Sequence, residues 1–244
     1  MQNKKHTWYA FISVLVFNIT MMFGQGHNSR DAYTRFGIAP VVGFYKLNSY
    51  HALNPKARMS FSVFLKREKS MDRSNRAFLS MGLEYLLHGA SYRSYYFSQD
   101  TLQLYDGSMG YNYRLNIGEL NAPIQAKITF KSTTNSLITP YLSVGYHLRY
   151  ILNTNLRVDQ DGAELKDEFV HLKFKNPLLQ ERFNSFAGIN FGVQNHRTRS
   201  NSITVFLELS YRYGFSPFGF KTNYSASSVY LNSQHLALNL GIGF

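Results

Sequence analysis

The feature that most constrains the fold of this chain is a regular alternation of large apolar residues with small or polar ones, sustained over long segments. It is clearest in residues 77–92, where one face carries Leu79, Met81, Leu83, Tyr85 and Leu87 and the other carries Ser80, Gly82, Glu84 and His88. Segments 138–152, 183–194 and 203–212 repeat the pattern. Alternation with period two is typical of a β-strand, and a tilted strand of about 9–11 residues crosses the hydrocarbon core of a bilayer. The chain is therefore predicted to be all-β, with strands of membrane-spanning length.

Four weaker alternating segments bring the number of predicted strands to eight. They are residues 35–47, 59–66, 115–131 and 235–244. The third changes phase near Gly118 and Glu119, which indicates a β-bulge. The last ends on Phe244 after alternating Leu and Ile residues, an ending that looks like the sorting signal of outer-membrane barrels.

The connections between these segments alternate in length. Short polar turns such as 132–136 and 195–201 alternate with longer connections, of which 157–182 is the longest. Short turns on one side and long loops on the other are typical of outer-membrane barrels. In hydrocarbon every backbone N–H and C=O needs a partner, so an open sheet with an unpaired edge is excluded. We therefore predict a closed, antiparallel, up-and-down transmembrane β-barrel of about eight strands.

Residues 1–26 are predicted to be a secretory signal peptide, and residues 27–244 the barrel domain. Two lysines precede an apolar run at 8–23, and Gly24 and Gly26 follow it, which is the order expected of a cleavable signal. A membrane anchor is the alternative, but an Asn and a Thr near the end of the run interrupt the roughly 20 apolar residues that a spanning helix needs. Because the chain is predicted to be an exported β-barrel, we expect the protein to lie in the outer membrane.

Composition limits the chemistry that this chain can perform. It contains no Cys, which excludes disulfides, a lipid anchor on cysteine and thiolate metal sites. The formal net charge is +12, but Lys and Arg are scattered rather than gathered in one basic block. We therefore predict contact with acidic lipid head groups or acidic partner proteins, and no binding of nucleic acid. No cofactor and no metal site is predicted.

The face that carries Gly, Ser, Asn and a few charges is predicted to line the barrel, because large apolar residues suit lipid. A water-soluble, lipocalin-like barrel is the alternative, and it would reverse the two faces. The residues predicted to form a structural polar network in the lumen are Glu84, His88, Lys127, His147, Arg149, Glu208 and Arg212. A competing hypothesis makes Glu84 and His88 the acid–base pair of a lipid hydrolase. Paired buried charges are tolerated, so we favour the structural interpretation.

Three short motifs resemble the PorT-like family of outer-membrane β-barrels of Gram-negative bacteria. They are Leu120–Lys127 (LNAPIQAK), Pro140–Tyr146 (PYLSVGY) and Leu207–Gly214 (LELSYRYG), similar to the family patterns L-E-I-P-L-x-x-K, P-Y-L-x-x-G and L-E-x-R-Y-x-Y-G. The chain departs at Asn121, where the family usually has Glu, and this removes one lumenal carboxylate. The resemblance implies an accessory role in the export and maturation of secreted proteins (the type IX route), and it brings no catalytic residues.

These observations favour a non-enzymatic outer-membrane barrel that acts by interaction, as a secretion accessory, an adhesin or a protein of envelope integrity. The alternative is a membrane-embedded hydrolase, either a lipid A deacylase or a surface protease. A porin is disfavoured, because side chains just fill the interior of an eight-strand barrel.

Overall fold

The computed structural model describes residues 32–47, 56–95, 110–130, 138–161, 171–175, 178–179, 182–195, 203–215, 218–221 and 229–244. The predicted signal peptide lies outside these ranges. Within them, no helix is long and apolar enough to cross a membrane.

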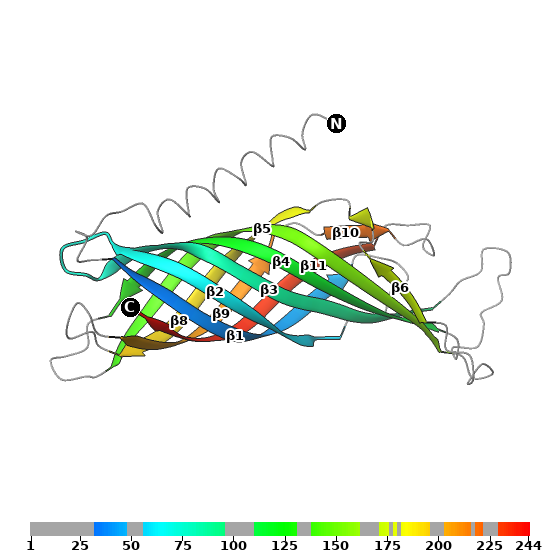
Figure 1. The fold of residues 1–244 in the computed structure, drawn as a ribbon, viewed down its shortest axis with the longest axis horizontal. Coiled ribbons are helices and arrows are strands. Elements are labelled where there is room, and N and C mark those ends of the chain that lie inside the picture. Colours follow the sequence, from blue (N-terminus) through cyan, green and yellow to red (C-terminus); the bar gives the residue numbers. More distant parts are fainter. Residues whose placement is uncertain are drawn as a thin grey trace, which may run out of the picture.

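Eight antiparallel strands form the wall of the barrel and close on themselves (Figure 1). In order around the barrel they are β1 (Ala32–Leu47), β2 (Arg58–Ser70), β3 (Ala77–Tyr95), β4 (Gly110–Thr129), β5 (Ile138–Asp161), β8 (Phe183–Asn195), β9 (Thr204–Gly214) and β11 (Val229–Gly243). β11 returns to pair with β1, from Arg35 opposite Gly243 to Leu47 opposite Leu231. This closure leaves no unpaired edge in the wall, as a hydrocarbon environment requires. The fold class predicted from the sequence is confirmed.

Three further short strands belong to the long connections: β6 (His171–Lys175), β7 (Leu178–Leu179) and β10 (Phe218–Lys221). β6 pairs with β5, while β10 pairs with both β11 and β7. Most predicted strands were too short: β2 continues to Ser70 and β5 to Asp161, while β4 begins at Gly110 and β11 at Val229. The predicted connection 157–182 therefore begins too early. Outside the hydrocarbon region a strand no longer needs an apolar outer face, so the alternation fades although the strand continues.

The two ends of the barrel differ in shape. At the turn end lie the first residue of β1, the last residue of the chain, the β2–β3 turn, the end of β4 with the start of β5, and the end of β8 with the start of β9 (Figure 1). At the opposite end, the loop end, β3, β4, β5 and β6 continue as a sheet beyond the rest of the wall (Figure 1). β5 has 24 residues but β9 only 11. Since about 9–11 residues cross the hydrocarbon core, roughly half of β5 extends past it.

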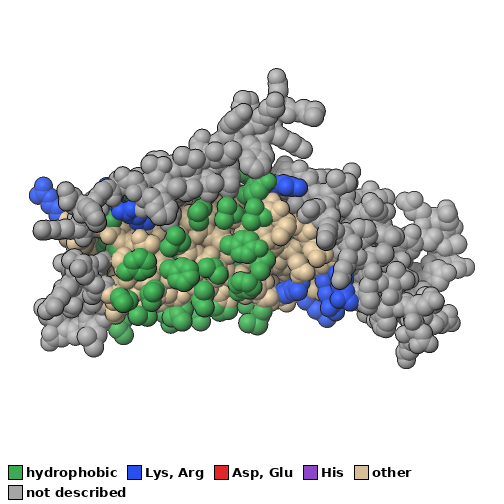
Figure 2. All heavy atoms as spheres, in the orientation of Figure 1, with side chains coloured by type: hydrophobic (Ala, Val, Ile, Leu, Met, Phe, Trp, Pro, Cys, Tyr) green, Lys and Arg blue, Asp and Glu red, His purple; other side chains and the backbone are tan. Residues whose placement is uncertain are grey.

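The outer surface carries a broad apolar belt with Lys and Arg beyond it at both ends (Figure 2). On β4 the outward positions from Phe130 to Leu120 are apolar, and the exposed Asn116 and Arg114 follow toward the loop end. Large apolar residues are likewise exposed along β9 and β11, among them Leu207, Leu209, Leu238, Leu240 and Ile242. A soluble barrel would hide such residues inside. The water-soluble alternative is therefore wrong, and the barrel is a transmembrane one.

The bulge predicted near Gly118 and Glu119 is present, but its extra residue lies in the neighbouring strand. The register between β4 and β5 shifts there, with Gly118 opposite Asn153 and Glu119 opposite Ile151. Leu152 is the additional residue on β5. β4 itself keeps its alternation, so Leu115 and Ile117 point into the barrel and are fully buried. The apparent change of phase in the sequence came from two apolar residues on the inner face.

The β2–β3 turn is held by the side chain of Asp72. Its Oδ1 accepts hydrogen bonds from the backbone N–H groups of Arg76 (2.9 Å) and Ala77 (2.8 Å), and its Oδ2 accepts one from the Ser74 hydroxyl. Asn75 adopts a φ of 52°, a left-handed conformation that Asn tolerates better than most residues. The hydrogen bonds from Ser74 and from the two backbone groups lower the pKa of the Asp72 carboxyl from 3.8 to about 2.

The acid response of this turn can be predicted from that pKa. A carboxyl whose pKa is lowered by folding stabilises the folded state above its ordinary pKa of 3.8, and this contribution is lost as the pH falls through about 2. An NMR titration of the folded barrel is expected to give a midpoint of about 2 for Asp72, and Ser74→Ala is expected to move it upward. Ser70→Ala is the matched control, because the Ser70 hydroxyl bonds only to the Asp72 carbonyl (2.8 Å). A wild-type midpoint at 3.8 would contradict the expectation.

Candidate functional site

The inside of the barrel is lined by buried charges. Five cationic side chains and four carboxylates of the described residues are at most 4% exposed there: Arg35, Lys66, Lys127, Arg149, Arg212, Glu68, Glu84, Glu119 and Glu208. Alternation brings them inward, because each strand turns every second residue toward the lumen. The charges nearly balance, which is the condition under which ionised groups are tolerated away from water. All seven residues predicted to line the lumen are buried inside it, His88 and His147 included.

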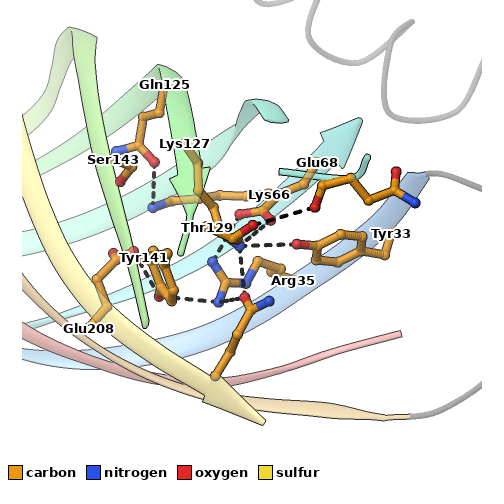
Figure 3. Close-up of polar contacts among 12 residues, drawn as sticks. Tyr33, Arg35, Lys66, Glu68, Gln125, Lys127, Thr129, Tyr141, Ser143 and Glu208 are labelled. Atoms are coloured by element: carbon orange, nitrogen blue, oxygen red, sulfur yellow. Dashed lines mark hydrogen bonds and ion pairs between the residues drawn. The ribbon is translucent and has the colours of Figure 1, made fainter. Parts of the chain in front are cut away.

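The largest group of contacts, the turn-end cluster, centres on Glu68 (Figure 3). Arg35 Nη1 donates to Glu68 Oε1 at 2.9 Å, and Lys127 Nζ donates to Glu68 Oε2 at 2.7 Å. Lys127 Nζ also donates to the Tyr33 hydroxyl at 3.0 Å and to Gln194 Oε1 at 2.8 Å. β1, β2, β4 and β8 each contribute at least one of these side chains. The cluster therefore ties together strands that lie on different sides of the barrel.

Aromatic rings complete the turn-end cluster. The Arg35 guanidinium lies over the Phe206 ring, 3.6 Å from its centroid, and donates to the Tyr141 hydroxyl at 3.2 Å. Tyr141 in turn donates to Glu208 Oε2 at 3.1 Å, and Asn239 Nδ2 donates to Glu208 Oε1 at 2.6 Å. A guanidinium over an aromatic face is attracted by the ring quadrupole. Glu208 therefore keeps both oxygens hydrogen-bonded, to neutral donors.

The middle of the lumen holds the ion pair between Arg212 and Glu84, with Arg212 Nη1 2.8 Å from Glu84 Oε2. Nearby, Lys66 Nζ donates to Gln125 Oε1 at 3.2 Å, and Gln125 Nε2 lies 3.1 Å from His147 Nε2. These contacts join β9 to β3 and β2 to β5 through the interior. They act as cross-braces between strands that are not neighbours in the wall.

A second group, the loop-end cluster, centres on Glu119. Arg149 Nε makes an ion pair with Glu119 Oε2, and His88 Nε2 lies 2.8 Å from the same oxygen. The hydroxyl of Tyr45 is hydrogen-bonded to His88 Nδ1. The ring of His235 lies 4.8 Å from that of His88, between centroids. Position 121, where the PorT-like pattern has Glu, is a buried Asn opposite Arg149, and Glu119 supplies the carboxylate instead.

The hypothesis of a Glu84–His88 acid–base pair does not match the geometry. Glu84 is engaged by Arg212, and His88 by Glu119 and Tyr45. Both side chains are buried, at 1% exposure for Glu84 and 3% for His88. The described part of the chain also brings together no group of three or more His, Asp or Glu side chains suited to a metal ion.

Sequence reasoning missed several members of the two clusters. Glu68 lies beyond the predicted strand 59–66, which ends four residues before the observed one, and Arg35 stands at the first position of a weakly patterned strand. Glu119 was passed over because the bulge obscured which face it occupies. A signal was nevertheless present for Arg35: it shares a face with Gly37, Ala39 and Gly43, the small residues typical of a lumen.

Comparison with known proteins gives structural likeness only. The chain matches no protein-family model and no curated protein sequence. Among solved structures it is similar to Neisserial surface protein A (15% identity, TM-score 0.42, covering 87% of this chain and 95% of that one) and to OprG from Pseudomonas aeruginosa (13%, 0.48, 90% and 98%). It is also similar to the outer membrane protease OmpT from Escherichia coli (6%, 0.37, 90% and 98%). At these identities and TM-scores, the fold assignment rests on the closed strand pairing of the chain itself.

Proposed function

We propose that this chain is a non-enzymatic protein of the bacterial outer membrane whose barrel is a closed, braced anchor. The observation that carries this proposal is the inverted distribution of side chains: the buried charges line the lumen, while the exposed residues of the wall form an apolar belt. A barrel of this kind is stable in hydrocarbon. Its wall faces lipid, so partner proteins would bind at its two ends. The long sheet of β3, β4, β5 and β6 at the loop end is the surface best placed to meet a partner.

The packed interior argues against a pore. Gly37 and Gly192 face the lumen, and a Cβ at either position would lie 2.5 Å from a ring carbon of Phe64 or Tyr141, respectively. Each ring belongs to the residue paired with the glycine on the neighbouring strand, and it lies directly against the glycine backbone on the lumenal side. Side chains occupy the space that water would need, as is usual for eight strands.

We further propose that this anchor serves as an accessory to protein secretion. The PorT-like motifs support this role. Such a role requires a membrane anchor and a surface for a partner, and it requires no catalytic group. Its test is deletion of the gene followed by measurement of secreted proteins in the culture medium. Loss of secretion that an intact copy of the gene restores supports the role. Normal secretion in the deletion strain would refute the secretion role, but not the proposal that the barrel is a membrane anchor.

The membrane anchor is tested by labelling single cysteines in a chain that has no native Cys. Val144 and Leu207 are 51% and 43% exposed on the belt, whereas Glu208 is 3% exposed inside. A lipid-soluble maleimide is expected to label Val144→Cys and Leu207→Cys in vesicles, and a water-soluble maleimide is not. Met71→Cys, at the exposed β2–β3 turn, is the matched control that the water-soluble reagent reaches.

Two outcomes contradict the proposed function. Labelling of the belt positions by the water-soluble reagent would show that no bilayer covers them. Hydrolysis of lipid A or of a peptide by the purified barrel, abolished by Glu84→Gln at unchanged stability, would establish the hydrolase instead.

A further inference from the structure

Two histidines inside the barrel have ring nitrogens without a hydrogen-bond partner. Neither Nδ1 nor Nε2 of His235 has one, and Nδ1 of His147 has none either. Both residues are 0% exposed. Buried polar atoms are nearly always hydrogen-bonded, and each exception calls for an explanation. His235 stabilises the folded barrel only as a packed ring, with its centroid 4.8 Å from that of His88 and 5.2 Å from that of Phe186.

The two histidines lie on either side of Arg212. His235 is the register partner of Arg212 on β11, and Gly188 is its register partner on β8. The ring of His147 lies over Gly188, because a Cβ at this glycine would be 3.0 Å from His147 Nε2 and 3.7 Å from Arg212 Cγ. Arg212 is the cation of the mid-lumen ion pair with Glu84. A proton on either histidine would therefore add a positive charge beside an existing one.

The surroundings of His235 do not favour a cation. The side chains that face it from five strands are two cations, three titratable rings and one uncharged ring: Arg149, Arg212, Tyr45, His88, His147 and Phe186. Glu119 of β4 is already engaged by Arg149 and His88, which both contact its Oε2. An imidazolium at position 235 would carry two N–H donors, and the neutral ring already leaves both nitrogens unpaired.

The surroundings of His147 are equally unsuited to a cation. Lys66 of β2 and Arg212 of β9 act on it electrostatically, and Glu84 of β3 is paired with Arg212. Gln125 of β4 accepts from Lys66 through Oε1, so its Nε2 faces His147 Nε2 as a donor at 3.1 Å. A protonated His147 would turn a second donor toward that amide. The contact therefore requires the neutral ring.

We propose that His147 and His235 make the braced interior of the barrel a switch that responds to mild acid. In water an imidazole takes up a proton near pH 6.5, whereas in the lumen the imidazolium would meet donors and cations. The folded barrel therefore binds fewer protons at these rings than the unfolded chain, and its stability falls as the pH drops below about 6.5. The affected brace is the ion pair of Arg212 with Glu84, which joins β9 to β3 through the lumen.

The experiment follows urea unfolding of the full barrel, refolded in phosphatidylcholine vesicles, at about pH 7.5 and about pH 5.5. A histidine that is protonated only in the unfolded chain raises the unfolding constant about tenfold between these values. The double variant His147→Gln/His235→Leu removes two such groups. The factor by which acid raises its unfolding constant is therefore expected to be about 100-fold smaller than for the wild type. This factor does not depend on the overall stability of a variant.

The matched control is Asn190→Ser. Asn190 is 1% exposed in the lumen and donates to the Ser143 hydroxyl at 2.7 Å, but it does not titrate. The variant is expected to lose stability equally at both pH values and to keep the wild-type acid factor. If the histidine double variant fails to fold, His235→Leu takes its place, because this substitution breaks no hydrogen bond. Its acid factor is expected to be about tenfold smaller than that of the wild type.

Two results would overturn the inference. Equal acid factors in the wild type and the histidine variant would show that the acid response comes from other groups. The second test is the imidazole NMR spectrum of the folded barrel, in which signals are assigned by their loss in the single variants. Both rings are expected to remain neutral down to about pH 5.5, and titration of either ring near pH 6.5 would mean that the folded lumen accepts the cation.

Discussion

Replacing Glu68 with glutamine is expected to remove about 3–5 kcal/mol from the free energy of unfolding, the typical cost of breaking a buried ion pair by deleting one partner. Glu68 is 2% exposed and accepts from Arg35 at 2.9 Å and from Lys127 at 2.7 Å. Its neutral amide leaves two buried cations without the carboxylate that both of them contact. The loss is measured by urea unfolding of the barrel refolded in lipid vesicles.

A second substitution separates charge imbalance from a simple loss of packing. In the Glu68→Gln background, Lys127→Met removes one of the two stranded cations, and it is expected to destabilise far less than it does in the wild type. Lys69→Gln is the matched control, because Lys69 is the exposed neighbour on the same strand, and surface changes of this kind usually stay within about 0.5 kcal/mol. Unfolding of Glu68→Gln at the wild-type urea concentration would show that the turn-end cluster contributes nothing to stability.

Placing arginine in the middle of the belt is expected to have the second largest effect. Leu209 is 49% exposed between Leu238 and Phe191 on the neighbouring strands. Leu209→Arg is expected to cost about 2–4 kcal/mol in a bilayer, and Ile203→Arg, just before the turn end of the same strand, only about 0–1 kcal/mol. Unfolding in vesicles compares the two, with Leu209→Ala as the control for lost side-chain volume. Equal costs at both depths would mean that no hydrocarbon layer surrounds the wall.

The strands of the barrel wall were predictable because all of them face the same hydrocarbon environment. Every strand in the belt must show apolar residues outward at every second position, so residues such as Leu83, Val144 and Leu207 reveal the register without any knowledge of their neighbours. The connection lengths then gave the closed antiparallel order. Strand ends were less predictable, because the selection for apolar residues stops at the edge of the hydrocarbon. Ser70 and Asp161 lie beyond that edge.

The interior was predictable only in part as a set of residues, and not at all as a set of contacts. Alternation places Glu84 and Arg212 on the inner face, but they are 128 residues apart in the sequence, and only the curvature of the closed wall brings them together. The sequence offered Glu84 and His88 as partners because they are four residues apart, although the wall directs each to a different partner. Contacts across a lumen depend on barrel size and strand stagger. The alternation of residues along a single strand gives no information on either quantity.

The pairing of β1 with β11 also determines how this protein folds. These strands are neighbours in the wall, yet Thr34 and Phe244 bond across almost the full length of the described chain. Contacts so distant in sequence are formed slowly, because the entropy of closing a long loop is lost before the contact stabilises anything. Until the seam closes, β1 and β11 each present a free row of backbone donors and acceptors to other chains. Once it closes, no strand of the wall has a loose edge from which to fray, so the barrel is expected to open slowly and in a single cooperative step.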